Sequence, residues 1–275
     1  MLKIIKRGFG TEALTASLQA KKVADLKIIA TECGVVTSGT KPVLINRLTA
    51  HFAAPTQSSS ILSFDLGYRN LAYCHLSADK TVIDWGRVDL DLPSFHPSVV
   101  APIVRQFIKD RVLQNLKVSD RVLVEQQRAR SNGSFNVLES TLRVNCVEAI
   151  LWCGLYEGID DIKRTVDLTP VHRQNIDRAW KDELQVIIDE NSQKFAKIKS
   201  NYYQKKQAGA LLVQKWLDTD TVITCSDHFK EMYAIEKKKD DLSDCLVQAL
   251  TWYKWESYSK LFLHQEHLDF IKKLN

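Results

Sequence analysis

The sequence lacks any apolar run approaching the ~18 residues that a membrane span requires. It has six cysteines, but none stand in a C-x-x-C pair, which argues against a zinc ribbon and against a disulfide-stapled secreted scaffold. The N-terminal segment is basic and free of acids until Glu12, yet it has no long apolar core, so it is not a secretory signal. A short mitochondrial presequence and a plain basic tail both fit this segment. These absences favour a globular chain in a reducing or organellar interior.

The whole excess of positive charge lies near the N-terminus. Residues 1–60 hold eight Lys and Arg against three acids, whereas residues 61–275 hold 30 of each sign. A small basic domain beside a neutral body with its own acidic cluster suggests an anionic polymer as partner. A solvated basic face is the alternative interpretation of the same charge.

The chain is predicted to have two parts joined by a linker. Residues 1–52 read as helical, residues 53–60 are small, polar and breaker-rich, and residues 61–275 form the large domain, with a helical insertion at about 172–235. The pattern of the first part resembles the SAP motif, a small helical module that binds DNA in its family; it runs from Val23-Ala24-Asp25-Leu26-Lys27 through Ser38-Gly39-Thr40-Lys41 to Arg47-Leu48. Lys41, at the opening of a helix, is then expected to face phosphate. A helical cap or a dimerisation element is the alternative.

The large domain is predicted to be α/β. Its patterns indicate three strands in a meander, a helix, a buried strand, a long helix, a fifth strand and a closing helix with a helical tail; the ranges are 60–66, 70–76, 81–88, 97–116, 121–125, 136–156, 163–168 and 240–258. This order, with an acid on the first strand, is that of the RNase H-like fold. We therefore expect a mixed five-stranded sheet with flanking helices.

Three groups of acids are the candidate functional residues. Asp65 and Glu125 each close a short apolar strand, and Asp241 and Asp244 are three apart, on one face of the closing helix, with Asp240 beside them. Each group alone has a structural explanation: a turn, a capping acid, or ordinary acids at a helix N-terminus. Together, in this strand order, they predict a pocket of oxygen ligands for Mg²⁺, with Mn²⁺ able to substitute.

Such a pocket predicts phosphodiester hydrolysis with two metal ions ~4 Å apart. Asp65 is the natural bridging ligand, and Glu125, Asp241 and Asp244 are expected to flank it. The predicted products carry a 5′ phosphate and a 3′ hydroxyl.

Longer motifs around these acids point to a family. The stretches resemble the fungal mitochondrial Holliday-junction resolvases, or cruciform-cutting endonucleases, of the RuvC-like branch of the RNase H-like superfamily; they are Asp65-Leu66-Gly67-x-Arg69-Asn70, Glu125-Gln126-Gln127-Arg128-x-Arg130-Ser131-Asn132-Gly133, Leu142-Arg143-Val144-Asn145 and Lys239-Asp240-Asp241-Leu242-x-Asp244. The resemblance implies a Mg²⁺-dependent homodimer that cuts four-way DNA junctions in mitochondria. It places the ligands at Asp65, Glu125 and the Asp240–Asp244 cluster. The partner of Asp244 stays open, although a spacing of three favours Asp241.

Basic and polar residues flank the acids. Arg128, Arg130, Ser131 and Asn132 follow the Glu125 strand and are predicted to contact DNA phosphates near the junction centre, with a solvated connector as the alternative. Lys238 and Lys239, directly before the third acidic group, are predicted to neutralise phosphates beside the cut.

Two other classes compete with a nuclease. An actin- or sugar-kinase-like ATPase also begins with a strand, an Asp and a Gly, but the chain lacks a second Asp-Gly phosphate loop and a Gly-Gly adenosine motif. A non-catalytic junction-binding protein on a nuclease scaffold would not need every carboxylate. We expect branched DNA as partner, and neither a small-molecule substrate nor a membrane.

Overall fold

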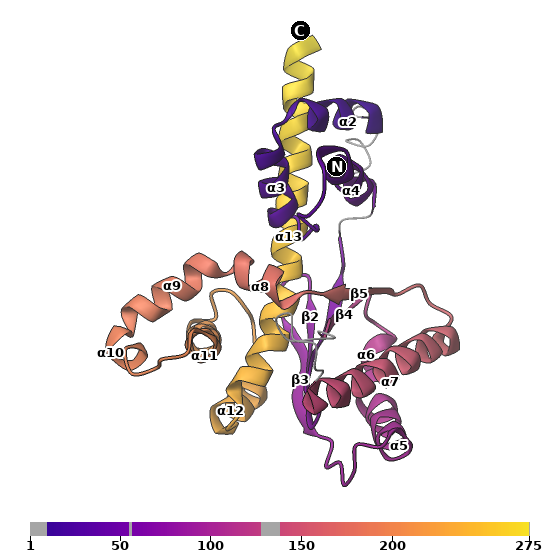
Figure 1. Cartoon of the computed structure of the whole chain (residues 1–275), viewed down its shortest axis with the longest axis vertical. Coiled ribbons are helices and arrows are strands. Elements are labelled where there is room, and N and C mark those ends of the chain that lie inside the picture. The colour runs from indigo at the N-terminus through magenta and orange to yellow at the C-terminus, as the bar shows by residue number, and fades with distance from the viewer. Residues whose placement is uncertain (1–9, 55–56, 128–137, 275) are drawn as a thin grey trace. The chain divides into compact units, whose positions relative to one another are not determined.

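The structure is a computed structural model that describes residues 10–54, 57–127 and 138–274. It divides into two compact units, one formed by Ser58–Leu250 and the other by Met1–Gln57 together with Thr251–Asn275 (Figure 1). Residues 251–275 were expected to belong to the large domain, but in the structure they group with the N-terminal helices. None of the described helices combines the length and the apolarity of a membrane span.

The larger unit is built on one mixed sheet. Its strands are β1 (Ser60–Leu66), β2 (Asn70–Ser77), β3 (Val82–Asp89), β4 (Arg121–Glu125) and β5 (Asp167–Val171), in the order β3-β2-β1-β4-β5. The three strands of the meander pair antiparallel, whereas β4 lies parallel to both β1 and β5. The predicted fold class is confirmed, and so is the parallel, buried position expected for 121–125.

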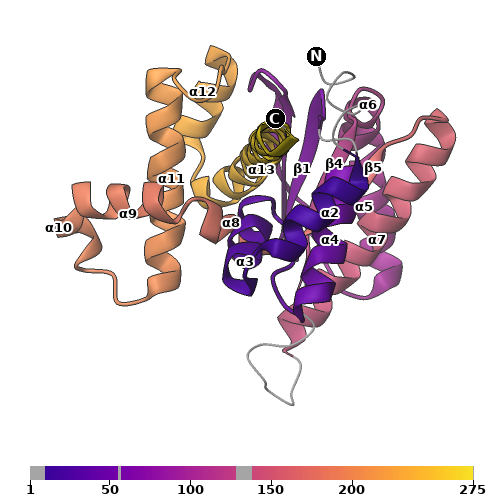
Figure 2. The same ribbon diagram turned by 90° about the horizontal axis from the view of Figure 1, so that it is seen from above.

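One face of the sheet is covered by helices that pack an apolar core. These are α5 (Pro97–Phe107), the π-helical turn η1 (Ile108–Val112), α6 (Leu113–Leu116) and α7 (Glu139–Ile162) (Figures 1 and 2). Alternate residues of the central strands point into this core, among them Phe64 of β1 and Val124 of β4, both fully buried. The intervening residues, Asp65 and Glu125, therefore point to the opposite face.

The fifth strand is displaced from its prediction, which placed it at 163–168. Lys163 ends α7 with a left-handed backbone (φ +50°), so the residues after it serve as a connector before β5 begins at Asp167. The strand contains Pro170, which normally speaks against a strand because it cannot donate a hydrogen bond. β5 is an edge strand, where a missing donor on the outer side is tolerated.

The opposite face of the sheet receives the first part of α13 (Lys239–Leu274) (Figure 2). The segment predicted as a helical insertion is helical; it consists of α8 (Arg173–Ala179), α9 (Lys181–Glu190), α10 (Ser192–Phe195), α11 (Asn201–Thr219) and α12 (Asp227–Ile235). Trp85 of β3 stacks on Tyr233 of α12 at 5.2 Å between ring centroids, and its indole Nε1 donates to the Leu242 carbonyl at 3.1 Å. These contacts fix the start of α13 against the sheet.

The smaller unit is a helical module completed by the C-terminal part of the chain. It contains α2 (Thr11–Ala20), α3 (Val23–Glu32), α4 (Lys41–Ala53) and the second part of α13. Phe52 of α4 stacks on Phe262 of α13 at 5.0 Å, and Lys21 forms an ion pair with the buried Glu266 at 2.7 Å. The described part of the first 52 residues is helical, as expected, but the packing of these helices against α13 was not foreseen.

Within this module, the backbone at Gly34 packs closely against α13. Gly34 follows α3 with φ +70°, a left-handed conformation that favours glycine. A Cβ atom added at Gly34 would lie 2.4 Å from ring atoms of Trp255, which is itself buried. The glycine is therefore required both by the backbone turn and by the indole packed over it.

Candidate active site

Asp65 and Glu125 meet at the carboxyl ends of two parallel strands. In the register of β1 and β4, Phe64 lies opposite Val124, so the next residue on each strand is one of the two acids. Both side chains point away from the α5–α7 core, because the residue before each points into it. The strand pairing alone thus brings together two acids that are sixty residues apart in sequence.

Helix α13 brings the third acidic group to the same place. Gln248 is buried on this helix and donates through Nε2 to the Ser63 hydroxyl at 2.9 Å and to the carbonyls of Phe64 and Leu123 at 3.2 and 3.3 Å. Asp244 lies one turn before Gln248 and Asp241 one turn earlier, on the same helical face. The amide therefore fixes the helix to β1 and β4 at the level that sets both aspartates beside Asp65.

These acids line one cavity of about 350 Å³, a volume within the range of ordinary ligand pockets. Its wall holds four acids and four bases, namely Asp65, Glu125, Asp241 and Asp244 with Arg69, Arg173, Lys206 and Lys238. Tyr68 and Tyr202 add aromatic surface. The cavity offers a dense cluster of carboxylates ringed by cations, which suits an anionic substrate held next to bound cations.

The surroundings of Asp65 strongly disfavour its ionised form. Burial raises the pKa of Asp65 well above its usual range, and the neighbouring charges of Glu125 and Asp244 raise it further. The charge of Asp241 adds to this effect on the pKa of Asp65. A buried group of like charges of this kind is stable only with a proton or a cation to offset it.

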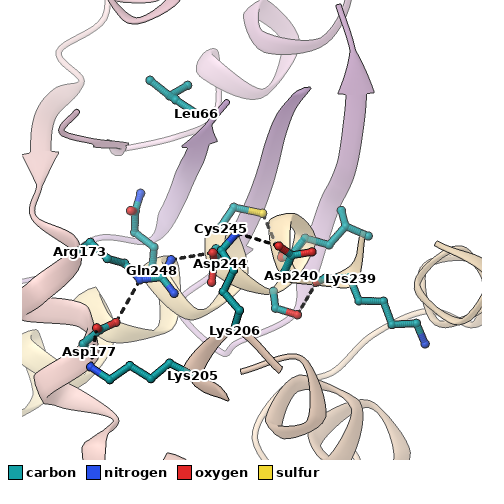
Figure 3. A network of polar contacts seen from close by, with 12 residues as sticks. Leu66, Arg173, Asp177, Lys205, Lys206, Lys239, Asp240, Asp244, Cys245 and Gln248 are labelled. Atoms are coloured by element: carbon teal, nitrogen blue, oxygen red, sulfur yellow. Dashed lines mark hydrogen bonds and ion pairs between the residues drawn. The ribbon is translucent and has the colours of Figure 1, made fainter. Parts of the chain in front are cut away.

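Two of the acids are offset by basic side chains. Arg173 Nη1 lies 2.6 Å from Asp244 Oδ2, and Lys206 Nζ lies 2.7 Å from Asp240 Oδ2 (Figure 3). Burial alone would lower the pKa of Arg173, but Asp244, Glu125 and Asp177 raise it well above its usual value. Within the described residues, no three acidic, histidine or cysteine side chains converge closely enough to hold an ion as they stand. The oxygen donors nevertheless fit a hard divalent cation, because the acids are adjacent and Asp65 is short of positive charge.

Asp240 and Asp241 occupy different environments. Asp241 lines the cavity, and its pKa is raised by burial and by the charge of Asp240. Asp240 is not part of the cavity wall; although burial opposes it, the ion pair with Lys206 holds the pKa of Asp240 below its usual value. The geometry thus favours Asp241 over Asp240 as the partner of Asp244.

The predicted DNA contacts are distributed unevenly. Lys238 is exposed and lines the cavity, whereas Lys239 lies over the Tyr233 ring at 5.0 Å and outside the cavity wall. Lys41 opens α4, and its Nζ donates to the Gln19 carbonyl at 2.6 Å within the helical module. Four further predicted contacts lie outside the described residues, namely Arg128, Arg130, Ser131 and Asn132.

Sequence reasoning missed Arg173 and Gln248, and it did not single out Lys206 among the lysines of residues 189–216. Arg173 lies two residues after Val171, the last residue of β5, and the sequence does not reveal this strand end because Pro170 speaks against a strand there. Lys206 is one of several lysines in the helical insertion, and the sequence alone does not show which way each helix of the insertion faces. Gln248 reads as an ordinary polar position of a helix until its three acceptors are known.

A family model described as "Mitochondrial resolvase Ydc2 / RNA splicing MRS1" matches residues 61–235, more than half of the chain. The chain belongs to this family. A SAP domain model matches residues 17–53, so the N-terminal helices of this Ydc2-family protein are a SAP domain, as expected from the pattern around Lys41. The family expected from the sequence motifs is confirmed.

Two curated relatives of this Ydc2-family chain carry the name "Cruciform cutting endonuclease 1, mitochondrial". The protein of Schizosaccharomyces pombe is 26% identical over 260 residues, covering 87% of this chain and 94% of that protein. The protein of Saccharomyces cerevisiae is 22% identical over 243 residues, covering 71% of this chain and 68% of that protein.

A solved structure supports the fold. The crystal structure of the yeast mitochondrial Holliday junction resolvase Ydc2 superposes with a TM-score of 0.62 at 22% identity, covering 92% of this chain and all (100%) of the other. The shared architecture is the mixed sheet with flanking helices described above.

Proposed function

We propose that the protein is a structure-specific endonuclease that resolves four-way DNA junctions by paired nicking. The observation that carries the proposal is the convergence of Asp65, Glu125, Asp241 and Asp244 in one cavity of a resolvase-family fold. The relatives named cruciform-cutting endonucleases support the substrate class. Both relatives are named as mitochondrial proteins. We therefore also propose that this protein acts in mitochondria, in the recombination or segregation of mitochondrial DNA.

The four acids are proposed to hold Mg²⁺, or Mn²⁺ in its place, as two ions. Bound divalent ions would supply the positive charge that these carboxylates lack and lower the pKa of an attacking water. Asp65 interacts electrostatically with Glu125, Asp244 and Asp241, so it would be the ligand that the two ions have in common. Oxygen-only donors of this kind suit hard cations rather than zinc.

The remaining side chains of the cavity are proposed to hold DNA. Arg69 and Lys238 are exposed at the cavity, where their charges can bind the phosphates on either side of the cleaved bond. Cleavage is proposed to leave a 5′ phosphate and a 3′ hydroxyl. A second copy of the chain is proposed to provide the second cut, because symmetric resolution needs two active sites facing one junction.

The family description also names RNA splicing, so a binding role without cleavage is the second candidate. A binding protein has no use for a buried acidic cluster, which destabilises the fold unless it holds a cation. The complete set of carboxylates favours the nuclease. The ATPase alternative is not retained, because the chain belongs to the resolvase family.

The test is a cleavage assay on labelled four-way junction, linear duplex and structured RNA, each with Mg²⁺ or with EDTA. We expect paired nicks at symmetric positions on the junction with Mg²⁺, with religatable ends, and no cleavage with EDTA or on the linear duplex. Tight junction binding without nicks under any divalent ion would instead favour the non-catalytic role. Gel-shift measurement on the same substrates separates the two cases.

A second prediction distinguishes the neighbouring aspartates. Asp241→Asn is expected to slow single-turnover nicking on the order of a hundredfold, because it removes a proposed metal ligand. Asp240→Asn is expected to slow it no more than about tenfold, the usual cost of losing a supporting group. The two variants are matched in charge and in helix position, so a larger loss in Asp240→Asn would reverse the assignment.

A further inference from the structure

Arg173 enters the acidic cavity from the edge strand of the sheet. In the register of β4 and β5, Val171 lies opposite Glu125, so the first residue of α8 follows at the same end of the sheet. Its guanidinium is only partly exposed, with 30% of the side chain accessible, and it lines the cavity with the four acids. An arginine placed here faces the group that a divalent cation would bind.

The guanidinium binds two acids through different nitrogens. Nη1 lies 2.6 Å from Asp244 Oδ2, whereas Nε donates to Asp177 Oδ1 at 3.0 Å, one turn along α8. The other Asp177 oxygen pairs with Lys205 at 3.0 Å (Figure 3). The result is a chain of alternating charges, Asp244–Arg173–Asp177–Lys205, with its first member in the cavity and its last on an exposed helix face.

We propose that Arg173 is a positioning residue that stands in for the divalent cation at Asp244 and withdraws onto Asp177 when the cation binds. The inference rests on the proposed metal site. It makes Arg173 a competitor for the metal and Asp177 the acid that holds the guanidinium once it has left Asp244. The arrangement keeps the cluster ordered without metal while keeping metal affinity modest.

The two separate anchoring nitrogens support this role. Because Nε already bonds Asp177, Nη1 can give up Asp244 without the arginine losing every partner. Lys206 differs, since its single ammonium pairs with Asp240, which lies outside the cavity wall. A guanidinium that leaves Asp244 free is also still close enough to bind a DNA phosphate in the loaded complex.

The test measures Mn²⁺ binding to the full-length protein without DNA. The readout is the electron paramagnetic resonance signal of the Mn²⁺ that stays free in solution. Arg173→Gln is expected to tighten Mn²⁺ binding roughly tenfold, because it removes a unit charge that competes for Asp244. Asp177→Asn is expected to weaken it about threefold, because the guanidinium then has only Asp244 to bind. Both variants are expected to lower the melting temperature in EDTA. If the two residues only stabilised the fold, both variants would change the Mn²⁺ affinity in the same direction, whereas the proposal predicts opposite directions.

Lys205→Gln is the matched control. It removes a positive charge from the same network, but from a side chain that is about half exposed (53%), where solvent and salt screen its effect. Its Mn²⁺ affinity is expected to stay within about twofold of the wild type. An equal tightening in Lys205→Gln and Arg173→Gln would reduce the effect to general charge and overturn the proposal.

The outcomes separate this inference from the metal site itself. Wild-type protein that binds no Mn²⁺ overturns the metal site and the inference with it. Wild-type protein that binds Mn²⁺, with unchanged or weaker binding in Arg173→Gln, overturns the inference alone. Should Arg173→Gln not fold, Asp177→Asn decides the question: weaker binding supports the role of Arg173, and unchanged or tighter binding contradicts it.

Discussion

Replacing Asp65 by asparagine is expected to abolish strand cleavage and, in the metal-free protein, to raise the melting temperature. Cleavage should fall on the order of a thousandfold or more, because the shared ligand of the proposed metal site is lost. Stability should rise because Asp65 is a carboxyl buried beside Glu125 and Asp244, whose charges oppose its ionisation. At neutral pH, each unit by which the pKa of Asp65 is raised in the folded protein lowers the stability of the wild type by about 1.4 kcal/mol. The neutral asparagine does not carry this cost.

The pH dependence gives the sign. The folded-state pKa of Asp65 lies above its usual value of 3.8, so the folded protein binds a proton there that the unfolded chain has already released. The contribution of Asp65 to stability is therefore full below about pH 4 and is lost as the pH rises toward the folded-state pKa. The difference between the wild-type and Asp65→Asn stability curves, measured in EDTA by urea unfolding, should grow with pH over this window.

Asp79→Asn is the control for this experiment. Asp79 is exposed in the turn between β2 and β3, and hydrogen bonds from Ser77 and Thr81 lower its pKa. Its replacement should leave cleavage unchanged and should not stabilise the protein at neutral pH. Parallel wild-type and Asp65→Asn curves, or retained cleavage in Asp65→Asn with unchanged junction binding, would contradict the role given to Asp65.

Gly34→Ala is expected to destabilise the helical module by roughly 2–4 kcal/mol. Part of this comes from the left-handed backbone at φ +70°, which alanine adopts at a cost. The larger part comes from the added methyl group, which would meet the buried Trp255 ring at 2.4 Å and cannot be accommodated by a flexible side chain. Hydrogen exchange should show faster opening of the amides of α3 and α4, with little change in the sheet of the larger unit.

Gly209→Ala provides the matched substitution. Gly209 lies within α11, and nothing stands within 4 Å of the position that its Cβ would take. There the same change should stabilise the protein by up to about 1 kcal/mol, since alanine favours a helix over glycine. Equal effects of the two substitutions would show that the approach of Trp255 to Gly34 does not matter.

The sequence predicts those parts of the fold that depend on local pattern. Short apolar runs located β1 and β4 to the residue, and each run ends in one of the acids that the parallel pairing of the two strands brings together. The fifth strand was misplaced because the sequence does not show where α7 ends, a boundary that is set by the left-handed backbone of Lys163. A strand containing Pro170 is recognisable only once its edge position is known.

The candidate site divides in the same way. The four acids could be proposed because each occupies a distinctive place, a strand end or a helix start. Arg173 and Gln248 could not be assigned their contacts, because both depend on which elements pack against the sheet. The choice between Asp240 and Asp241 needed the rotation of α13, which Gln248 and Trp85 fix through tertiary contacts.

The helical module is assembled from both ends of the chain, and this affects the order in which the protein folds during synthesis. α2, α3 and α4 leave the ribosome before the sheet strands, but the residues that close their core, Phe262 and Trp255 among them, are translated only after residues 58–250. Domains generally fold as units once their chain is available. The SAP domain is therefore expected to complete its folding last, so that DNA binding by this domain becomes possible only when the chain carrying the acidic cluster has already been made.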